Sequence, residues 1–302
     1  MSMKELATGL KFPEGPVAMD DGSVIVVEIA AGRLTRVKPD GKTQTIAKTG
    51  GGPNGLAIGP DGAFYVCNNG GSFSYVKRQG LNIPGPTPPT HKGGRIERVN
   101  ISTGKTEVLY DKCDGERLIG PNDIVFDNAG GFWFTDYGAS SHKSRTHGAL
   151  YYAKANGSKI TRVLRELITP NGVGLSPDET VVYAADTNLG RLWAFDITGP
   201  GEVAQLGFAP GRVVCNLQGY QLLDSLAVEA GGKVCVATII NGGITAFDPD
   251  GSTEHFAVPD MITTNICFGG ADMRDAWITA SASGKLYKTR WPRPGLKLNF
   301  NA

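Results

Sequence analysis

Six short segments of this sequence begin with a polar residue and continue into an apolar run. The lead residues are Glu14, Asn54, Asn122, Asn171, Asp224 and Thr264. Carboxylate and amide oxygens, which five of the six carry, are the ligands that a hard cation such as Ca²⁺ takes. Cys and His do not recur at these positions, so Zn²⁺ fits them less well. A single Asn-Gly pair has a local explanation as a turn or strand start, and the prediction of metal chemistry therefore rests on the aligned set.

Each segment is also followed by a turn seven positions after its lead residue. The turns are Asp21-Gly22, Asp61-Gly62, Ala129-Gly130, Asp178-Glu179, Gly231-Gly232 and Ala271-Asp272. A strand-like run follows every turn, and repeated units of about 40 residues are typical of propellers. We therefore predict an all-β fold, a six-bladed β-propeller with a central metal site. The lead residues would begin the innermost strands and surround one channel.

Residues 1–302 are predicted to form a single domain, because a propeller closes when all its blades are present. Residues 1–10 are expected to complete the last blade and protect its open edge. The spacing of the lead residues places an insertion in the second blade, at about residues 70–93. This insertion contains Phe73, Tyr75, Leu81 and Ile83, which favours an ordered lid over a polar tail. The alternative is that its apolar residues pack on the blade surface.

Composition and charge exclude several classes of protein. The formal net charge is +1 and the chain has no Lys/Arg-rich run, so nucleic acid is not an expected partner. It also has no apolar stretch of roughly 18 residues, so a membrane is not expected either. The five cysteines are odd in number and scattered, which argues against a disulfide framework and favours a reducing cytoplasm. Residues 1–10 lack the apolar core of a signal peptide. The oligomeric state is not indicated.

In their order and spacing, these motifs resemble the gluconolactonase/regucalcin family, also called the senescence-marker-protein (SMP-30/gluconolactonase/LRE-like) family. The resemblance rests on Pro13-Glu14-Gly15-Pro16, Gly120-Pro121-Asn122-Asp123, Pro170-Asn171-Gly172 and Asp224-Ser225-Leu226-Ala227. It implies one catalytic divalent ion, most often Ca²⁺ and in some members Zn²⁺, Mn²⁺ or Mg²⁺. It also implies that Glu14, Asn171 and Asp224 are metal ligands. Asn122 would lie on the substrate side and serve as a further ligand in some members.

The resemblance implies metal-dependent hydrolysis of a lactone, or of a related cyclic or carboxylic ester, as a small-molecule substrate. A cation polarises the carbonyl group in such a reaction. Asp224 is the predicted base for the attacking water, and Asn122 would orient the carbonyl or donate to the oxyanion. Asn54, Phe73 and Tyr137 are predicted to contact the substrate. Members of the family that act on sugar lactones carry an Arg at the position of Gly120. Because this chain lacks that Arg, we do not expect an aldonolactone as the substrate.

Two other functions remain open on the sequence. One is a metal-dependent phosphotriesterase like diisopropyl-fluorophosphatase, whose ring this chain resembles more distantly. The other is a non-catalytic Ca²⁺-binding propeller. A WD40-like scaffold is disfavoured because the outer strand-like segments lack Trp-Asp closures. His142 and His147, in a smaller insertion at residues 140–147, are weaker candidates for acid/base groups than Asp224.

Overall fold

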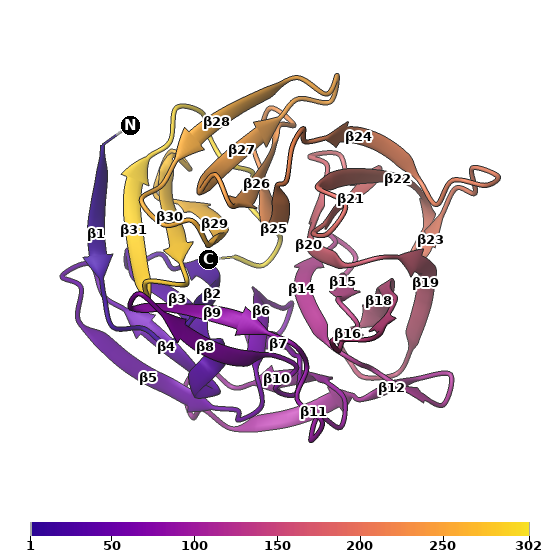
Figure 1. Ribbon diagram of the computed structural model, residues 1–302, viewed down its shortest axis with the longest axis horizontal. Helices are drawn as coiled ribbons and strands as arrows, with labels where there is room; N and C mark the ends of the chain where they lie inside the picture. Colours follow the sequence, from indigo (N-terminus) through magenta and orange to yellow (C-terminus); the bar gives the residue numbers. More distant parts are fainter. Residues whose placement is uncertain (1, 302) are drawn as a thin grey trace.

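The computed structural model describes residues 2–301 and is built almost entirely of antiparallel strands (Figure 1). Within these residues, the one helical element is the short 3-10 turn η1 (Ile29–Ala31). Six sheets are arranged around a common centre as the blades of a propeller. The prediction of a six-bladed β-propeller is therefore confirmed. No helix within residues 2–301 is long and apolar enough to cross a membrane.

The blades are four-stranded meanders that follow one another along the chain. The first blade comprises β2 (Pro13–Ala18), β3 (Val24–Glu28), β4 (Arg33–Val37) and β5 (Thr43–Lys48). The second comprises β6 (Pro53–Ile58), β7 (Phe64–Asn68), β10 (Arg95–Val99) and β11 (Thr106–Tyr110). The third comprises β14 (Pro121–Phe126), β15 (Gly131–Asp136), β18 (Gly148–Lys154) and β19 (Ile160–Leu167).

The fourth blade comprises β20 (Pro170–Leu175), β21 (Val181–Asp186), β22 (Arg191–Gly199) and β24 (Arg212–Asn216). The fifth comprises β25 (Leu222–Val228), β26 (Val234–Ile239), β27 (Gly243–Phe247) and β28 (Thr253–Ala257). The sixth comprises β29 (Thr263–Gly269), β30 (Asp275–Ala280), β31 (Lys285–Arg290) and β1 (Met3–Ala7). The short strand β23 (Glu202–Val203) pairs with β22. Three two-stranded hairpins lie between main strands, namely β8 (Ser74–Arg78) with β9 (Leu81–Gly85), β12 (Lys112–Cys113) with β13 (Glu116–Arg117), and β16 (Ala139–Ser140) with β17 (Arg145–Thr146).

The ring is closed by strands from the two ends of the chain. Strand β1 pairs antiparallel with β31, with Met3 opposite Thr289 and Lys4 opposite Lys288. An ion pair of 2.7 Å joins Lys285 to Glu5 on the same two strands. This pairing covers the edge that the sixth blade would otherwise expose. It places residues 3–7 as the sequence predicted.

The innermost strands contact one another around the channel, each touching its neighbours on both sides. Gly15 has a φ of +48°, and a Cβ at this position would collide with the backbone oxygen of Asn54. A Cβ on Gly172 would lie 2.6 Å from the Leu226 nitrogen. A side chain does not fit between backbones this close. The Gly after several lead residues is therefore explained by the tightness of the inner ring.

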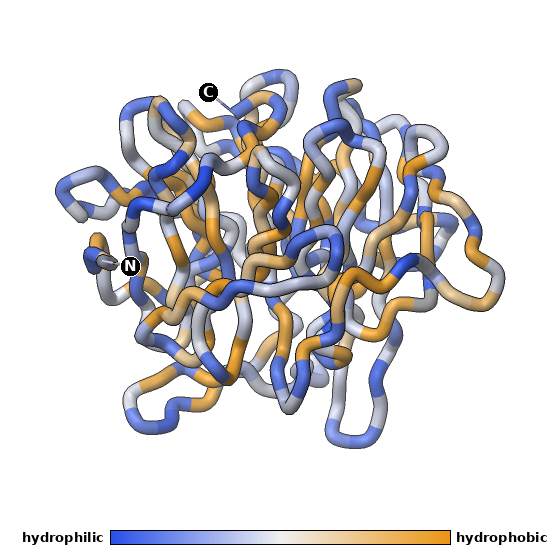
Figure 2. Tube along the Cα trace, turned by 90° about the horizontal axis from the view of Figure 1, so that it is seen from above, coloured by the Kyte–Doolittle hydropathy of each residue, from blue (hydrophilic) through white to orange (hydrophobic). Residues whose placement is uncertain are grey.

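The insertion in the second blade forms the β8–β9 hairpin, which lies across one face of the propeller (Figure 1). Its backbone is attached at two distant points, because Asn82 N donates to Ala282 O at 2.9 Å and Thr87 N donates to Ser140 O at 2.8 Å. Tyr75 and Leu81 pack against the apolar core of the first two blades. The C-terminus lies at one face of the disc when the molecule is seen from above (Figure 2).

Candidate active site

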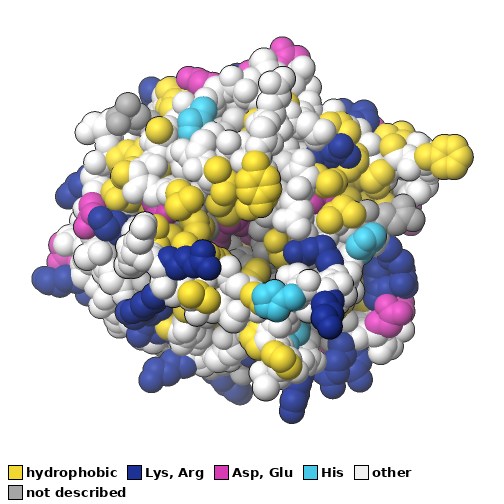
Figure 3. Space-filling model, in the orientation of Figure 1, with side chains coloured by type: hydrophobic (Ala, Val, Ile, Leu, Met, Phe, Trp, Pro, Cys, Tyr) yellow, Lys and Arg dark blue, Asp and Glu magenta, His cyan; other side chains and the backbone are white. Residues whose placement is uncertain are grey.

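All seven residues predicted from the sequence as site residues line one cavity. They are Glu14, Asn54, Phe73, Asn122, Tyr137, Asn171 and Asp224. The cavity has a volume of about 550 Å³, within the range of small-molecule sites. It lies beside the β8–β9 hairpin, of which Ile83 forms part of the lining. On this face, hydrophobic side chains gather around a central hollow (Figure 3).

A break in strand register aims the lead side chains at the channel. The pairing of β2 with β3 shifts between Glu14 and Val17, and β14 and β20 shift at the equivalent places next to Asn122 and Asn171. Such bulges interrupt the alternation of side chains and redirect individual residues. The lead residue therefore faces the large cavity, whereas the next residue, such as Asp123, lines a second cavity further along the channel.

Buried acids at the ends of the second strands hold the loops that lead into the inner strands. Asp136 accepts hydrogen bonds from Ile119 N at 2.7 Å and Gly120 N at 2.8 Å. Glu28 accepts one from Lys11 N at 2.8 Å in the first blade. By fixing these loops, the acids position the lead residues that follow. These acids were not among the predicted site residues, although an acid or amide ends the second strand in four blades, at Glu28, Asn68, Asp136 and Asp186.

Two buried oxygens in the cavity have no hydrogen-bond partner among the described residues. Glu14 Oε2 accepts from Gly15 N at 2.6 Å and from Asn265 Nδ2 at 2.8 Å, which leaves Oε1 unpartnered. The Oδ1 atom of Asn122 is unpartnered as well. Both residues are 2% exposed. Since buried polar atoms are almost always satisfied, this pair fits the coordination of a hard cation.

The two carboxyl groups of the cavity are difficult to ionise together. Burial raises the pKa of Asp224 to about 8; the Asn171 amide opposes the rise and the Asp123 carboxylate adds to it. Burial also raises the pKa of Glu14 well above its ordinary range, and the neighbouring Asp224 raises it further. A bound divalent cation would favour the charged form of both groups. The electrostatics therefore fit a metal site.

Asn171 completes the polar floor of the cavity. Its Nδ2 donates to Thr187 Oγ1 at 3.2 Å, and its Oδ1 lies 3.4 Å from Ser225 Oγ, a weak contact that leaves the carbonyl oxygen able to bind a cation. Within residues 2–301, no three His, Cys, Asp or Glu side chains form a group that could hold a metal ion. A cation here would therefore need the amide oxygens as well as the two carboxylates.

The sixth lead residue, Thr264, has a different role from the other five. Its Oγ1 lies 2.9 Å from Thr279 Oγ1 and is within 3.5 Å of Pro13 O, so it ties the sixth blade to the first. Thr264 begins an inner strand as predicted, but it does not line the large cavity with the other five lead residues, because its short hydroxyl is used in contacts between strands. His142 and His147 are both exposed on the surface loop.

Two walls rise from this floor. On blades 3 and 4 the wall is polar and comprises Tyr137, Ser140, Thr187 and Asn188. The other wall comes from blades 5, 6 and 1, and we call it the apolar wall: Phe12, Ile29, Ile239, Ile240, Met261 and Ile262. Phe73 and Tyr137 meet with ring centroids 5.8 Å apart. The apolar wall was not predicted from the sequence, because its residues lie in loops and strand ends that share no repeated spacing.

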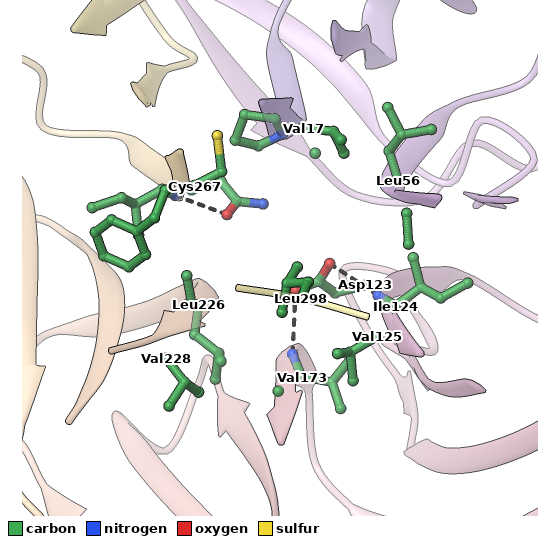
Figure 4. Close-up of a pocket in the computed structure, with 18 of the residues that line it drawn as sticks. Val17, Leu56, Asp123, Ile124, Val125, Val173, Leu226, Val228, Cys267 and Leu298 are labelled. Atoms are coloured by element: carbon green, nitrogen blue, oxygen red, sulfur yellow. Dashed lines mark hydrogen bonds between the residues drawn. The ribbon is translucent and has the colours of Figure 1, made fainter. Parts of the chain in front are cut away.

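The far end of the channel is closed by the C-terminal segment. A second, smaller cavity of about 70 Å³ lies there, and Leu298 lines it together with apolar residues of the inner strands (Figure 4). Asp123 is at its centre, accepting from Ile124 N at 2.9 Å and from Val173 N at 3.2 Å. Burial raises the pKa of Asp123 to about 7. We therefore take the hairpin face as the entrance to the large cavity.

The fold and the cavity define a six-bladed propeller with a group of carboxyl and amide side chains at the centre of its channel. The chain belongs to the family described as SMP-30/Gluconolactonase/LRE-like region, and the model of this family matches residues 12–282. A lactonase drp35 from Staphylococcus epidermidis is 25% identical over 234 residues, which are 76% of this chain. The chain spans 64% of the length of that relative, which is less than two thirds.

Two solved structures extend the comparison. A gluconolactonase from Xanthomonas campestris matches with a TM-score of 0.76 and 22% identity, covering 96% of this chain and 89% of its own. A calcium-binding protein, regucalcin, from Agrobacterium tumefaciens matches with a TM-score of 0.73 and 18% identity, covering 98% of both chains. At these identities the two structures show the shared fold.

Proposed function

We propose that this protein is a divalent-metal-dependent hydrolase of lactones. The observation that carries the proposal is the convergence of Glu14, Asn122, Asn171 and Asp224 on one cavity, with Glu14 Oε1 and Asn122 Oδ1 buried and unpartnered. The relatives named lactonase and gluconolactonase support the same reaction class. The regucalcin structure, described as calcium-binding, supports Ca²⁺ as the first ion to test.

Glu14, Asn171 and Asp224 would hold the cation, with Asn122 close by as a further ligand. When bound, the cation supplies Lewis-acid polarisation of the substrate carbonyl. Binding also requires both carboxylates to be ionised. Because burial raises the pKa of each in the metal-free protein, metal uptake must release protons.

The chain's own residues would perform the remaining chemistry. The Asn122 amide donates a hydrogen bond to the substrate carbonyl oxygen, where negative charge develops. Asp224 takes a proton from a water molecule as the water oxygen bonds to the carbonyl carbon. The ring C–O bond then breaks, and the proton passes to the leaving alkoxide. The product is the open-chain hydroxy acid.

A metal-reconstitution assay tests the proposal. The protein is stripped with a chelator, checked by metal analysis and assayed with Ca²⁺, Mg²⁺, Mn²⁺ or Zn²⁺ against aldonolactones, aliphatic lactones, aryl esters and a phosphotriester. We expect lactone turnover that disappears on stripping and returns with metal. Full activity in the stripped protein would contradict the metal dependence. Turnover of the phosphotriester alone would assign a phosphotriesterase, and metal binding without any turnover would indicate a binding protein.

A further inference from the structure

We propose that the substrate is an uncharged lactone with an alkyl or aryl substituent, and that the apolar wall binds this substituent. The inference rests on the proposed lactonase function and adds the class of substrate. The wall residues come from three consecutive blades, so they form one continuous side of the cavity. The polar wall faces them from blades 3 and 4. A lactone ring at the polar floor would therefore direct its substituent along one side.

The lining of the cavity also disfavours anionic and heavily hydroxylated substrates. Among the described residues that line it, none is Lys, Arg or His. A phosphate or carboxylate substituent placed against the apolar wall would have no cationic side chain beside it and would pay a large desolvation cost. A sugar lactone presents hydroxyl groups on every side, whereas Phe12, Ile29 and Ile262 can form no side-chain hydrogen bonds with them.

Two residues of the apolar wall are held in an unfavourable backbone conformation. Phe12 has a φ of +58° and Ile240 a φ of +89°, in a region that bulky and β-branched side chains rarely adopt. Backbone hydrogen bonds hold both loops, from Ile29 N to Phe12 O at 3.1 Å and from Ile240 N to Met261 O at 2.9 Å. Strain of this kind concentrates at functional sites.

Apolar surface continues from the wall to the mouth of the cavity. Ile240 is 38% exposed and Met261 is 46% exposed, although both also line the cavity. The hydrophobic atoms around the hollow are visible on this face (Figure 3). An apolar chain longer than the cavity would therefore find further contacts at the rim.

The first test is a chain-length series assayed with the metal-loaded protein. The substrates are γ-butyrolactone, γ-lactones with progressively longer 4-alkyl chains, and D-glucono-1,5-lactone. Each methylene that becomes buried should raise kcat/KM by about fourfold until the wall is covered. Met261→Ser and Ile240→Ser should lower the ratio of long-chain to short-chain kcat/KM by roughly three- to tenfold. Phe208→Ser, at a fully exposed apolar residue on the fourth blade, is the control and should leave the ratio unchanged.

A binding measurement separates this inference from the lactonase proposal. Calorimetry with non-hydrolysable γ-alkyl lactams should show affinity that rises with chain length and that Met261→Ser weakens. That result without lactone turnover would support the wall and reject the hydrolase. Turnover with no dependence on chain length, or a preference for D-glucono-1,5-lactone, would overturn the inference and leave the hydrolase standing. A preference for an anionic lactone, lost in Arg145→Gln, would also overturn it, because Arg145 stacks over Tyr137 at 5.2 Å.

Discussion

Asp224→Asn is expected to stabilise the metal-free protein while removing its activity. Burial raises the pKa of Asp224 from 3.8 to about 8, and the carboxyl group therefore resists ionisation in the folded state. Each pKa unit corresponds to about 1.4 kcal/mol, so a rise of about four units corresponds to roughly 5 kcal/mol. Water in the open cavity screens part of this ionisation cost, so we expect Asp224 to destabilise the metal-free wild type by about 2–4 kcal/mol. An amide of the same shape avoids this cost.

The sign of the effect depends on pH. Below about pH 4 the carboxyl group is protonated in both the folded and the unfolded state, so the wild type and the variant differ little in stability. Between pH 4 and pH 8 the unfolded chain releases the proton and the metal-free folded protein retains it, which destabilises the wild type increasingly. The stability gap should therefore widen up to about pH 8 and stay constant above it.

Thermal and urea denaturation in the presence of a chelator, at pH 5, 6, 7 and 8, measure this gap. At pH 8 we expect the Tm of the variant to exceed that of the wild type by roughly 3–6 °C. Added Ca²⁺ should stabilise the wild type much more than the variant. Turnover should fall by about 10²-fold or more because a general base is lost, and saturating metal should not restore it. Near-complete recovery of turnover at saturating metal would show that Asp224 serves only as a metal ligand and not as the base.

Asp123→Asn is the matched control, because it makes the same chemical change at a buried acid that lies near Asp224 but lines the second cavity. Asp123 accepts hydrogen bonds from the backbone of Ile124 and Val173, and an amide replaces one acceptor oxygen with a donor. Because burial also raises the pKa of Asp123, to about 7, the amide relieves part of the same ionisation cost at pH 8, and the lost acceptor opposes this gain by about 1–3 kcal/mol. We therefore expect a smaller gain in stability at pH 8 than for Asp224→Asn. The electrostatic argument is refuted if metal-free Asp224→Asn is no more stable than the wild type at pH 8, or if the gap does not widen between pH 5 and pH 8.

Three further predictions concern the metal, the inner ring and the insertion. Exhaustive chelation should lower both Tm and lactone turnover, with recovery of both on adding metal; an unchanged Tm would argue against a site at this position. Gly172→Ala should lower the free energy of unfolding by about 2 kcal/mol or more and weaken metal binding, because its Cβ would lie 2.8 Å from Asp224 O. Gly231→Ala is the control in the same urea denaturation assay and should leave stability unchanged, because its Cβ would meet nothing within 4 Å. Replacing residues 70–93 by a short Gly-Ser turn should shift relative kcat/KM between small and bulky lactones while metal affinity, measured by calorimetry, is kept; constant ratios would leave the hairpin as packing for the blades.

Much of the fold could be predicted because each blade is encoded locally. A lead residue, a turn seven positions later and a strand-like run recur in every unit, and units of the same kind stack in the same way to cover their apolar faces. The observed inner strands begin within two residues of the predicted positions, at Pro13, Pro53, Pro121, Pro170, Leu222 and Thr263. The closing strand β1 followed from the same logic, since an open blade edge is unfavourable.

The sequence by itself determined which polar groups meet at the channel, because equivalent positions of a closed ring must converge. It could not determine how a bulge divides neighbouring side chains, such as Asn122 and Asp123, between two cavities, nor that Thr264 joins two blades. The apolar wall was decided by the tertiary structure alone. Phe12 and Met261 lie in loops and Ile239 ends β26, so they share no repeated spacing, yet they line one cavity when the ring closes. Loops carry no period that could reveal such a surface, whereas the strands that support them do.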